Sequence, residues 1–290
     1  MVETVLQFQI DDKYVAARIP PRKKDSHKGM NGVVCVVGGS RIYHGAPFLG
    51  AMGALRTGLD LVYLAVPAVI VGAIRGLSPD LIVIPLPDGK LTTGGISKLA
   101  SWLPHVDCIG VGPGLGPQDE DRLARCLEIL SEKSGCMVVD ADALRPRILT
   151  LANRTKMVVT PHAGEFERLF GTKLPVDVGP RAEAVAMKAK ENGVTVLLKG
   201  PTDIVSDGTK VGLNTTHSPS MTVGGTGDVL TGIATGLLAK GLGPFDASCC
   251  AIFINGLAGV AATESHGLHI TASDVVEQIA AVMKRYDRLE

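Results

Sequence analysis

Short apolar runs recur along the chain, and most are followed by small or polar residues. The runs are rich in Val, Ile and Leu, and they do not alternate with polar positions as half-exposed strands do. They predict strands at residues 33–39, 61–67, 81–87, 107–114, 136–142, 157–164 and 194–200. Because a continuously apolar strand is buried on both faces, we expect an α/β fold with a mostly parallel central sheet flanked by helices.

The segments between these runs carry apolar residues at helical spacing. This pattern predicts helices within residues 48–58, 118–133 and 181–193, and later helices near 227–240, 244–265 and 272–286. Residues 201–215 have an Asp-Gly turn between two strand-like runs, which is typical of an antiparallel hairpin. We expect one domain over residues 28–290, preceded by an irregular arm at residues 1–27.

Composition narrows the class of protein. Lys plus Arg and Asp plus Glu both number 29, so no overall field attracts nucleic acid or an anionic membrane. The N-terminus lacks the basic flank and long apolar core of a signal peptide. Residues 249–262 fall short of the roughly 18 that a membrane span needs, and we interpret them as a core or subunit-contact helix. We expect neither a membrane nor a nucleic-acid partner.

The chain has six cysteines and no C-x-x-C pair. Most of them lie in apolar runs, which is typical of buried, reduced thiols. Reduced thiols favour a cytoplasmic location.

Small or polar residues follow five of the predicted strands, at 38–40, 110–116, 140–144, 160–166 and 199–203. Ligands of open α/β sheets bind beyond the carboxyl ends of the strands. The sequence therefore predicts one clustered ligand site at this edge.

A glycine-rich seam, G-G-T-G-D at 224–228, precedes one of the late helices. Glycines permit close approach of a ligand, and the first amides of a helix lack partners within it, so the seam suits an anion such as phosphate. Asp228 then has two interpretations. It is either a general base for a hydroxyl that attacks the phosphate, or an acid that complements the helix dipole.

Two common nucleotide-binding motifs are absent from the sequence. There is no G-x-x-x-x-G-K-[ST], and residues 110–116 lack the G-x-G-x-x-G register. The phosphate site must therefore have another architecture.

The seam after an α/β sheet and a hairpin resembles the ribokinase-like superfamily, which has a three-layer fold. An ordered set of motifs is similar, more narrowly, to the NAD(P)H-hydrate dehydratase family. The motifs are K-G (28–29), V-V-G-G-S (36–40), G-A-P (45–47), G-V-G-P-G-L-G (110–116), V-D-A-D-A-L (139–144), T-P-H-A-G-E-F (160–166), L-K-G (198–200) and G-G-T-G-D-V-L-T-G (224–232).

This resemblance implies a carbon–oxygen lyase that repairs hydrated NADH or NADPH with a nucleotide as energy source. The ring hydroxyl is phosphorylated, and phosphate is then eliminated. Asp228 would be the base, and the amides of Gly225, Thr226 and Gly227 would stabilise the migrating phosphoryl group. The motifs T-P-H-x-G-E-F and G-G-T-G-D favour ADP over ATP as the nucleotide. The resemblance also implies Mg²⁺ as a cofactor.

The resemblance also assigns binding residues. The nucleotide would contact Lys199, Gly200, Pro201, Thr202, Asp203 and Gly227. The hydrated dinucleotide would contact Ala46, Gly112, Gly114, His162 and Asp228. Gly116 would shape the same loop as Gly112 and Gly114.

Some of these side chains also have structural interpretations. Lys199 is alternatively an ordinary lysine at a strand end, and His162 a structural histidine. Glu165 either influences Mg²⁺ through water or caps a helix near Gly164. The roles of Asp140 and Asp142 stay open, and two carboxylates without a third ligand do not define a metal site.

Other functions remain open at this point. The same loop and base would serve a hydroxymethylpyrimidine or hydroxyethylthiazole kinase, and a non-catalytic nucleotide-binding regulator is a further alternative. Many bacterial relatives carry an N-terminal epimerase domain, which a 27-residue arm cannot form. We therefore expect action on the S-epimer alone, by a homo-oligomer such as a tetramer.

Overall fold

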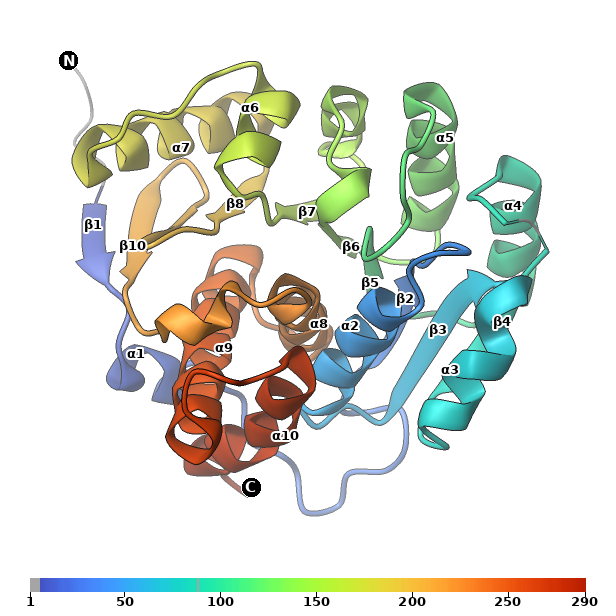
Figure 1. The fold of residues 1–290 in the computed structure, drawn as a ribbon, viewed down its shortest axis with the longest axis horizontal. Helices are drawn as coiled ribbons and strands as arrows, with labels where there is room; N and C mark the ends of the chain where they lie inside the picture. The colour runs from blue at the N-terminus through green and yellow to red at the C-terminus, as the bar shows by residue number, and fades with distance from the viewer. Residues whose placement is uncertain (1–5, 88) are drawn as a thin grey trace.

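A computed structural model describes residues 6–87 and 89–290. It has three layers, with one sheet between two sets of helices (Figure 1). The strands are β1 (Leu6–Gln9), β2 (Val33–Val37), β3 (Leu61–Pro67), β4 (Ile82–Leu86), β5 (Cys108–Val111), β6 (Cys136–Val139), β7 (Lys156–Val159), β8 (Thr195–Leu198), β9 (Asp203–Ser206) and β10 (Lys210–Asn214). Their order in the sheet is β1-β10-β9-β8-β7-β6-β5-β2-β3-β4.

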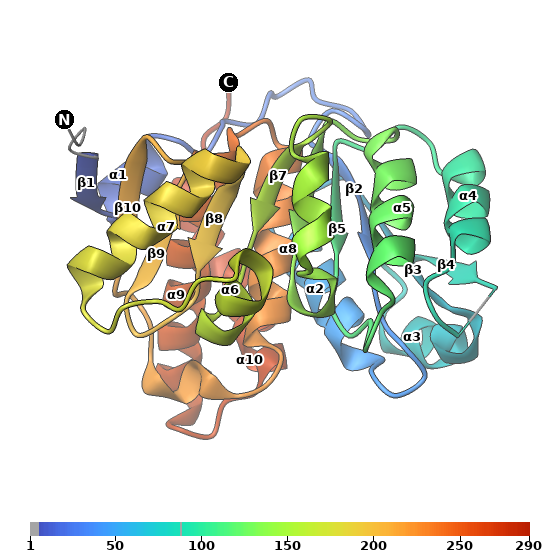
Figure 2. The same cartoon turned by 90° about the horizontal axis from the view of Figure 1, so that it is seen from above.

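Helices cover both faces of the sheet (Figures 1 and 2). One layer holds α1 (Asp12–Ala16), α2 (Gly45–Leu55), α3 (Val71–Leu77), α8 (Thr226–Ala239), α9 (Pro244–His266) and α10 (Ala272–Met283). The other holds α4 (Thr93–Trp102), α5 (Glu120–Ser131), α6 (Ala163–Phe170) and α7 (Val178–Asn192). Short 3₁₀ helices lie in the connections: η1 (Ala68–Ile70), η2 (Ala141–Ala143), η3 (Pro146–Leu151), η4 (Pro219–Thr222) and η5 (Lys284–Tyr286).

Both faces of the central strands are buried, as the apolar runs predict. Along β2, Val34 and Val36 join the core beneath α8 and α9, whereas Cys35 and Val37 join the core on the other side. The strands pair in parallel except for β9, which is antiparallel to β8 and to β10. The predicted parallel sheet and the 201–215 hairpin are therefore confirmed.

The chain changes direction across the sheet at β2. It runs from β2 through β3 to β4 at one edge, and then returns to place β5 on the other side of β2. Connections leave β2 and β5 on opposite faces of the sheet, so their carboxyl ends form the switch point at which open α/β sheets bind ligands. The glycine-rich segments 38–40 and 110–116 lie at that point.

The expectation of an irregular N-terminal arm is wrong for residues 6–16. Strand β1 pairs in parallel with β10, and helix α1 packs against α9. Ile10 and Val15 are almost completely buried, and Phe8 packs against the same core. These few apolar side chains suffice to add the segment to the domain, although its charged neighbours mask the signal in the sequence.

Helices α8 and α9 form the centre of their layer. Helix α9 is long and apolar enough to cross a membrane, but 78% of its apolar 18-residue stretch is buried inside the molecule. The apolar character of α8 and α9 is thus explained by packing inside one molecule. The sequence left open that residues 249–262 form a subunit contact, but this apolar character is not in itself an argument for self-association.

Candidate active site

The G-G-T-G-D seam forms the N-terminus of α8. Gly225 is the N-cap residue with φ of 101°, and a Cβ at this position would lie 2.7 Å from Leu49 and 2.8 Å from Ala272. Only glycine fits this conformation and this space. The amides of Thr226, Gly227 and Asp228 open the helix and have no acceptor among the described residues.

Thr226 contributes its amide and not its hydroxyl. Its Oγ1 donates to the carbonyl oxygens of Met221 and Val223, at 2.9 and 3.2 Å. The side chain therefore holds the seam in shape, and a ligand would meet only the N–H of this residue.

Lys199, at the end of β8, reaches the same helix terminus. A Cβ on Gly227 would lie 3.5 Å from Nζ of Lys199, so glycine leaves room for the ammonium. Nζ is 2.9 Å from Oδ1 of Asp140 and 3.7 Å from Oε2 of Glu165. A cation and a row of free amides thus meet at one place, which suits an anionic phosphate.

Asp140 is a buried carboxylate that joins three elements. It follows β6, accepts from Lys199 on β8, and accepts from Oγ1 of Thr231 on α8 at 2.7 Å. Thr231 lies within the G-G-T-G-D-V-L-T-G motif, but no spacing in the chain distinguishes it from its neighbours. The hydroxyl fixes the second turn of α8 relative to the sheet, one turn beyond Asp228.

The electrostatics of the site favour a proton acceptor at Asp228. The pKa of Asp228 is raised to about 7: burial contributes most, Asp140 also raises it, Lys199 opposes the rise, and Glu165 and Asp142 add to it. Burial acts to lower the pKa of Lys199, but Asp140 and Glu165 outweigh burial and raise it. A base with a pKa near neutrality is well matched to proton transfer.

His162 and Glu165 form a capping box at the start of α6. Nδ1 of His162 accepts from the amides of Gly164 and Glu165, and Oε2 of Glu165 accepts from the His162 amide at 2.9 Å. The capping interpretation of Glu165 is confirmed. The side chain stays 59% exposed, although Nε2 lies 3.5 Å from Oε1 of Glu165, so a ligand could reach the ring from solvent.

The segment 199–203 forms a tight connection between β8 and β9. Oδ1 of Asp203 accepts from the Gly200 amide at 3.0 Å, and Oδ2 accepts from Nδ2 of Asn214 at 2.9 Å. Burial raises the pKa of Asp203. Both carboxylate oxygens are engaged, so Asp203 shapes the loop, while Pro201 is exposed and Gly200 and Thr202 are partly exposed.

Three of the residues assigned to the dinucleotide, Ala46, Gly112 and Gly114, lie beyond the carboxyl ends of β2 and β5. A Cβ on Gly114 would lie 3.1 Å from Cβ of Ala46, and one on Gly112 would lie 1.9 Å from the Asp140 carbonyl oxygen. Oδ2 of Asp142 accepts from the Gly116 amide at 2.9 Å and tethers the loop. Gly112 and Gly116 therefore shape the loop that presents Gly114.

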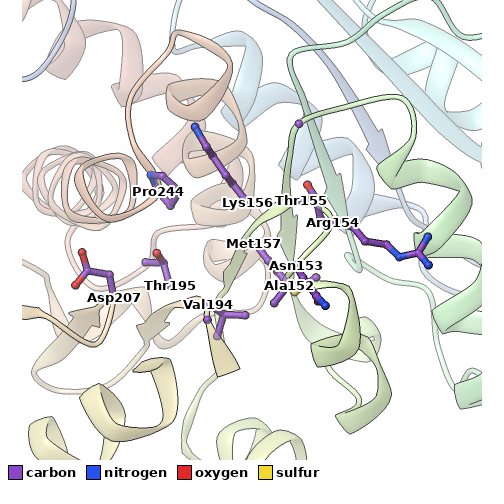
Figure 3. Close-up of a pocket in the computed structure, with 12 residues that line it drawn as sticks. Ala152, Asn153, Arg154, Thr155, Lys156, Met157, Val194, Thr195, Asp207 and Pro244 are labelled. Carbon is purple, nitrogen blue, oxygen red and sulfur yellow. The ribbon is translucent and has the colours of Figure 1, made fainter. Parts of the chain in front are cut away.

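A cavity of about 530 Å³ lies elsewhere, at the amino ends of β7 and β8 (Figure 3). Lys156, Thr195 and Asp207 are among its lining residues. It occupies the edge of the sheet opposite Asp228. We place the site at the carboxyl edge, because the free amides, Lys199 and Asp228 meet there.

Acidic side chains at the site do not form a metal centre by themselves. Among the described residues there is no group of three His, Cys, Asp or Glu side chains that could hold a metal ion. Asp140 uses its two oxygens on Lys199 and Thr231, and one oxygen of Glu165 caps α6. The protein therefore does not supply a closed cation site.

The fold and the site together define a ribokinase-like α/β protein with an anion-binding helix terminus and an adjacent carboxylate. The family model described as NAD(P)H-hydrate dehydratase matches residues 34–281. The chain belongs to this family.

Individual relatives agree with this assignment. The chain is 50% identical over 273 residues to the ADP-dependent (S)-NAD(P)H-hydrate dehydratase of Cenarchaeum symbiosum, covering 94% of this chain and 95% of the relative. It is 44% identical to the bifunctional NAD(P)H-hydrate repair enzyme Nnr of Pyrobaculum aerophilum, covering 91% of this chain but 53% of that protein.

A solved structure has the same fold. The ADP/ATP-dependent NAD(P)H-hydrate dehydratase of Bacillus subtilis, co-crystallised with ATP and Mg²⁺, aligns with a TM-score of 0.83 and 26% identity. The alignment covers 99% of this chain and 100% of the other.

Proposed function

We propose that this protein is an ADP-dependent dehydratase that converts the S-epimer of hydrated NADH or NADPH to NAD(P)H, with release of AMP and phosphate. The observation that carries the proposal is the meeting of Asp228, the free amides of α8 and Lys199 at one end of the sheet. The names of the relatives in Cenarchaeum symbiosum and Bacillus subtilis supply the substrate class.

The mechanism begins with phosphoryl transfer. Asp228 accepts the proton of the ring hydroxyl as the hydroxyl oxygen bonds to the β-phosphorus of ADP, and the bond from that phosphorus to the AMP oxygen breaks. The amides of Gly225, Thr226 and Gly227, with Lys199 beside them, stabilise the charge on the group in transfer. Asp228 is the residue whose removal stops this step.

Elimination then completes the dehydration. The lone pair of the ring nitrogen expels the phosphate ester, which carries away the former hydroxyl oxygen, and a proton leaves the neighbouring ring carbon. The product is the dihydronicotinamide. Gly114 and Ala46 lie against each other where the ring would bind, and the backbone of His162 pairs with that of Lys199.

Mg²⁺ would enter with the nucleotide. Because the described side chains offer no closed cation site, its ligands would be the phosphate oxygens of ADP and water.

An absorbance assay for regenerated NADH tests the function. Purified protein is given hydrated NADH with either ADP or ATP, and we expect a higher rate with ADP. A higher rate with ATP would contradict the nucleotide preference, and no NADH with either nucleotide would contradict the dehydratase.

Asp228→Asn is the matched control for this assay. It should still bind ADP but lose roughly 10²–10⁴-fold in turnover, since the general base is gone. Phosphorylation of a hydroxymethylpyrimidine or hydroxyethylthiazole, without formation of NADH, would instead identify a kinase.

We also propose a homo-oligomer, such as a tetramer, in the cytoplasm. An apolar groove of about 420 Å³ beside the edge strand β4 supports self-association, because it leaves Trp102 59% and Ile82 37% exposed. Free cysteines support a reducing compartment. Analytical ultracentrifugation of the purified protein at several concentrations gives its molecular mass in solution and so tests whether it is a homo-oligomer.

A further inference from the structure

Two cysteines begin neighbouring strands at the edge of the sheet opposite Asp228. The register pairs Ile109 of β5 with Met137 of β6, so Cys108 and Cys136, one residue earlier on each strand, are also neighbours. Residues side by side on paired strands point to the same face. Both cysteines contact the core beneath α8 and α9, which agrees with this register.

Their spacing suits a covalent bond between them. Adjacent strands lie about 4.7–4.9 Å apart, which is within the Cα separations of about 4.4–6.8 Å found in disulfides. The Cys136 thiol donates to the carbonyl oxygen of Asp107 at 3.0 Å, which places its sulfur next to the residue that precedes Cys108. Cys35, on the next strand, belongs to the core on the other side of the sheet and is not in this pair.

The two cysteine residues differ in their exposure to solvent. Cys136 is partly exposed, whereas Cys108 is buried. Lys156 is the strand partner of Cys136 on β7, and together with Gly135 it lines the cavity of about 530 Å³. Figure 3 shows the Lys156 side chain extending towards Pro244 at the side of this cavity. A small polar oxidant that enters the cavity would therefore approach the Cys136 side of the pair.

The surroundings favour the thiolate at Cys136. Interaction with the Cys108 thiol lowers the pKa of Cys136; burial opposes this, the Lys156 ammonium lowers it, Asp107 raises it, and Ser134 lowers it. Burial raises the pKa of Cys108. The exposed cysteine is thus the nucleophile, and the buried one is suited to resolve the product.

We propose that Cys108 and Cys136 are a dithiol site that a peroxide converts to a reversible disulfide. The Cys136 thiolate attacks a peroxide oxygen, the O–O bond breaks, and a sulfenic acid forms with release of water. The Cys108 sulfur then displaces the sulfenic oxygen as a second water, and an S–S bond forms. Overall, two thiols and one hydrogen peroxide give one disulfide and two waters. This proposal does not rest on the proposed function.

Mass spectrometry of the full chain tests the proposal. After hydrogen peroxide treatment we expect a loss of about 2 Da, reversed by dithiothreitol. Trypsin should then release a linked pair of peptides, residues 99–122 and 134–147. An unchanged mass, a bond between other cysteines, or sulfinic acid at Cys136 without a link would overturn the proposal.

Single variants separate the two roles. Cys136→Ser should abolish the loss of 2 Da, and Cys108→Ser should leave Cys136 as a sulfenic acid that a dimedone probe traps. Cys126→Ser, in a buried position on α5, is the matched control and should behave as the unmodified chain does. A link that survives Cys136→Ser would count against the assignment. If a variant fails to fold by circular dichroism, the peptide map of the unmodified chain decides.

Discussion

At the scale of single residues, the site depends on how one carboxylate changes the proton affinity of another. Asp140, Glu165 and Asp142 surround Asp228 with negative charge, and Lys199 is the facing cation. Asp140 keeps its own charge, because Lys199 and the hydroxyl of Thr231 outweigh burial and lower its pKa. Asp228 is therefore the member of the group that titrates near neutral pH.

This arrangement predicts the pH dependence of the rate. The pKa of Asp228 is raised to about 7, and only the ionised carboxylate accepts a proton, so kcat/KM should rise with pH through about 7. Asp140→Asn removes a negative charge and frees Lys199 to face Asp228. Both changes lower the pKa of Asp228, and the midpoint should move to lower pH by roughly 1 unit.

Rate profiles of the two variants Asp140→Asn and Asp142→Asn provide the check. Asp142 has a weaker influence on Asp228, so its variant should shift the midpoint less. Equal shifts, or an unmoved midpoint in Asp140→Asn, would show that Asp140 only maintains the fold.

Some positions in the candidate site could be predicted from the sequence and others could not. The motifs and strand ends correctly place the G-G-T-G-D seam, Asp228 and Lys199 at the carboxyl edge of the sheet. The capping bonds of His162 and the engagement of Asp203 with Asn214 depend on side-chain orientation, which no spacing reveals. Thr231 was missed because its partner, Asp140, lies 91 residues away in the sequence.

At the scale of elements, glycines allow α2 and α8 to pack with their backbones in contact. A Cβ on Gly232 would lie 1.9 Å from the Gly50 carbonyl oxygen, and one on Gly53 would lie 2.6 Å from that of Val229. The obstructing atoms belong to backbone, so they cannot rotate away. This contact holds α8, which begins with the G-G-T-G-D seam, against α2, which carries Ala46.

Gly232→Ala should therefore be destabilising. Overpacking against backbone costs roughly 1–3 kcal/mol in free energy of unfolding, measured by denaturant titration. Gly76→Ala in α3 is the control, since a Cβ there meets nothing within 4 Å. It should be neutral or stabilise by up to about 1 kcal/mol. A neutral Gly232→Ala would mean that the two helices can separate freely.

Elements were predicted best where the apolar pattern was long. The strands from β2 to β8 and the helices α8, α9 and α10 agree with the expected segments to within a few residues. The pattern was weakest for β1 and α1, where four- and five-residue elements are ordered by contact with β10 and α9. Short elements of this kind owe their order to tertiary contacts, which the local sequence does not contain.

At the scale of the whole molecule, binding of nucleotide should stabilise the fold. A ligand at 100 times its Kd adds about 2.7 kcal/mol, which corresponds to roughly 5–10 °C in Tm for a chain of this size. We expect this shift with ADP in a thermal melt, and an equal shift for Asp228→Asn.

Lys199→Ala should reduce the shift and also lower the Tm without nucleotide. The second effect follows because the buried Asp140 loses its cation. A full ADP shift in Lys199→Ala would exclude this lysine from nucleotide binding.

The bonds that Asp140 makes also bear on synthesis of the chain. Its two partners lie 59 and 91 residues further along the sequence, on β8 and α8. During synthesis, the Asp140 carboxylate therefore has neither the Lys199 ammonium nor the Thr231 hydroxyl as a partner until most of the polypeptide has left the ribosome. A nascent chain that stops before residue 228 would lack both Asp228 and the helix that carries it, so a complete site forms only near the end of translation.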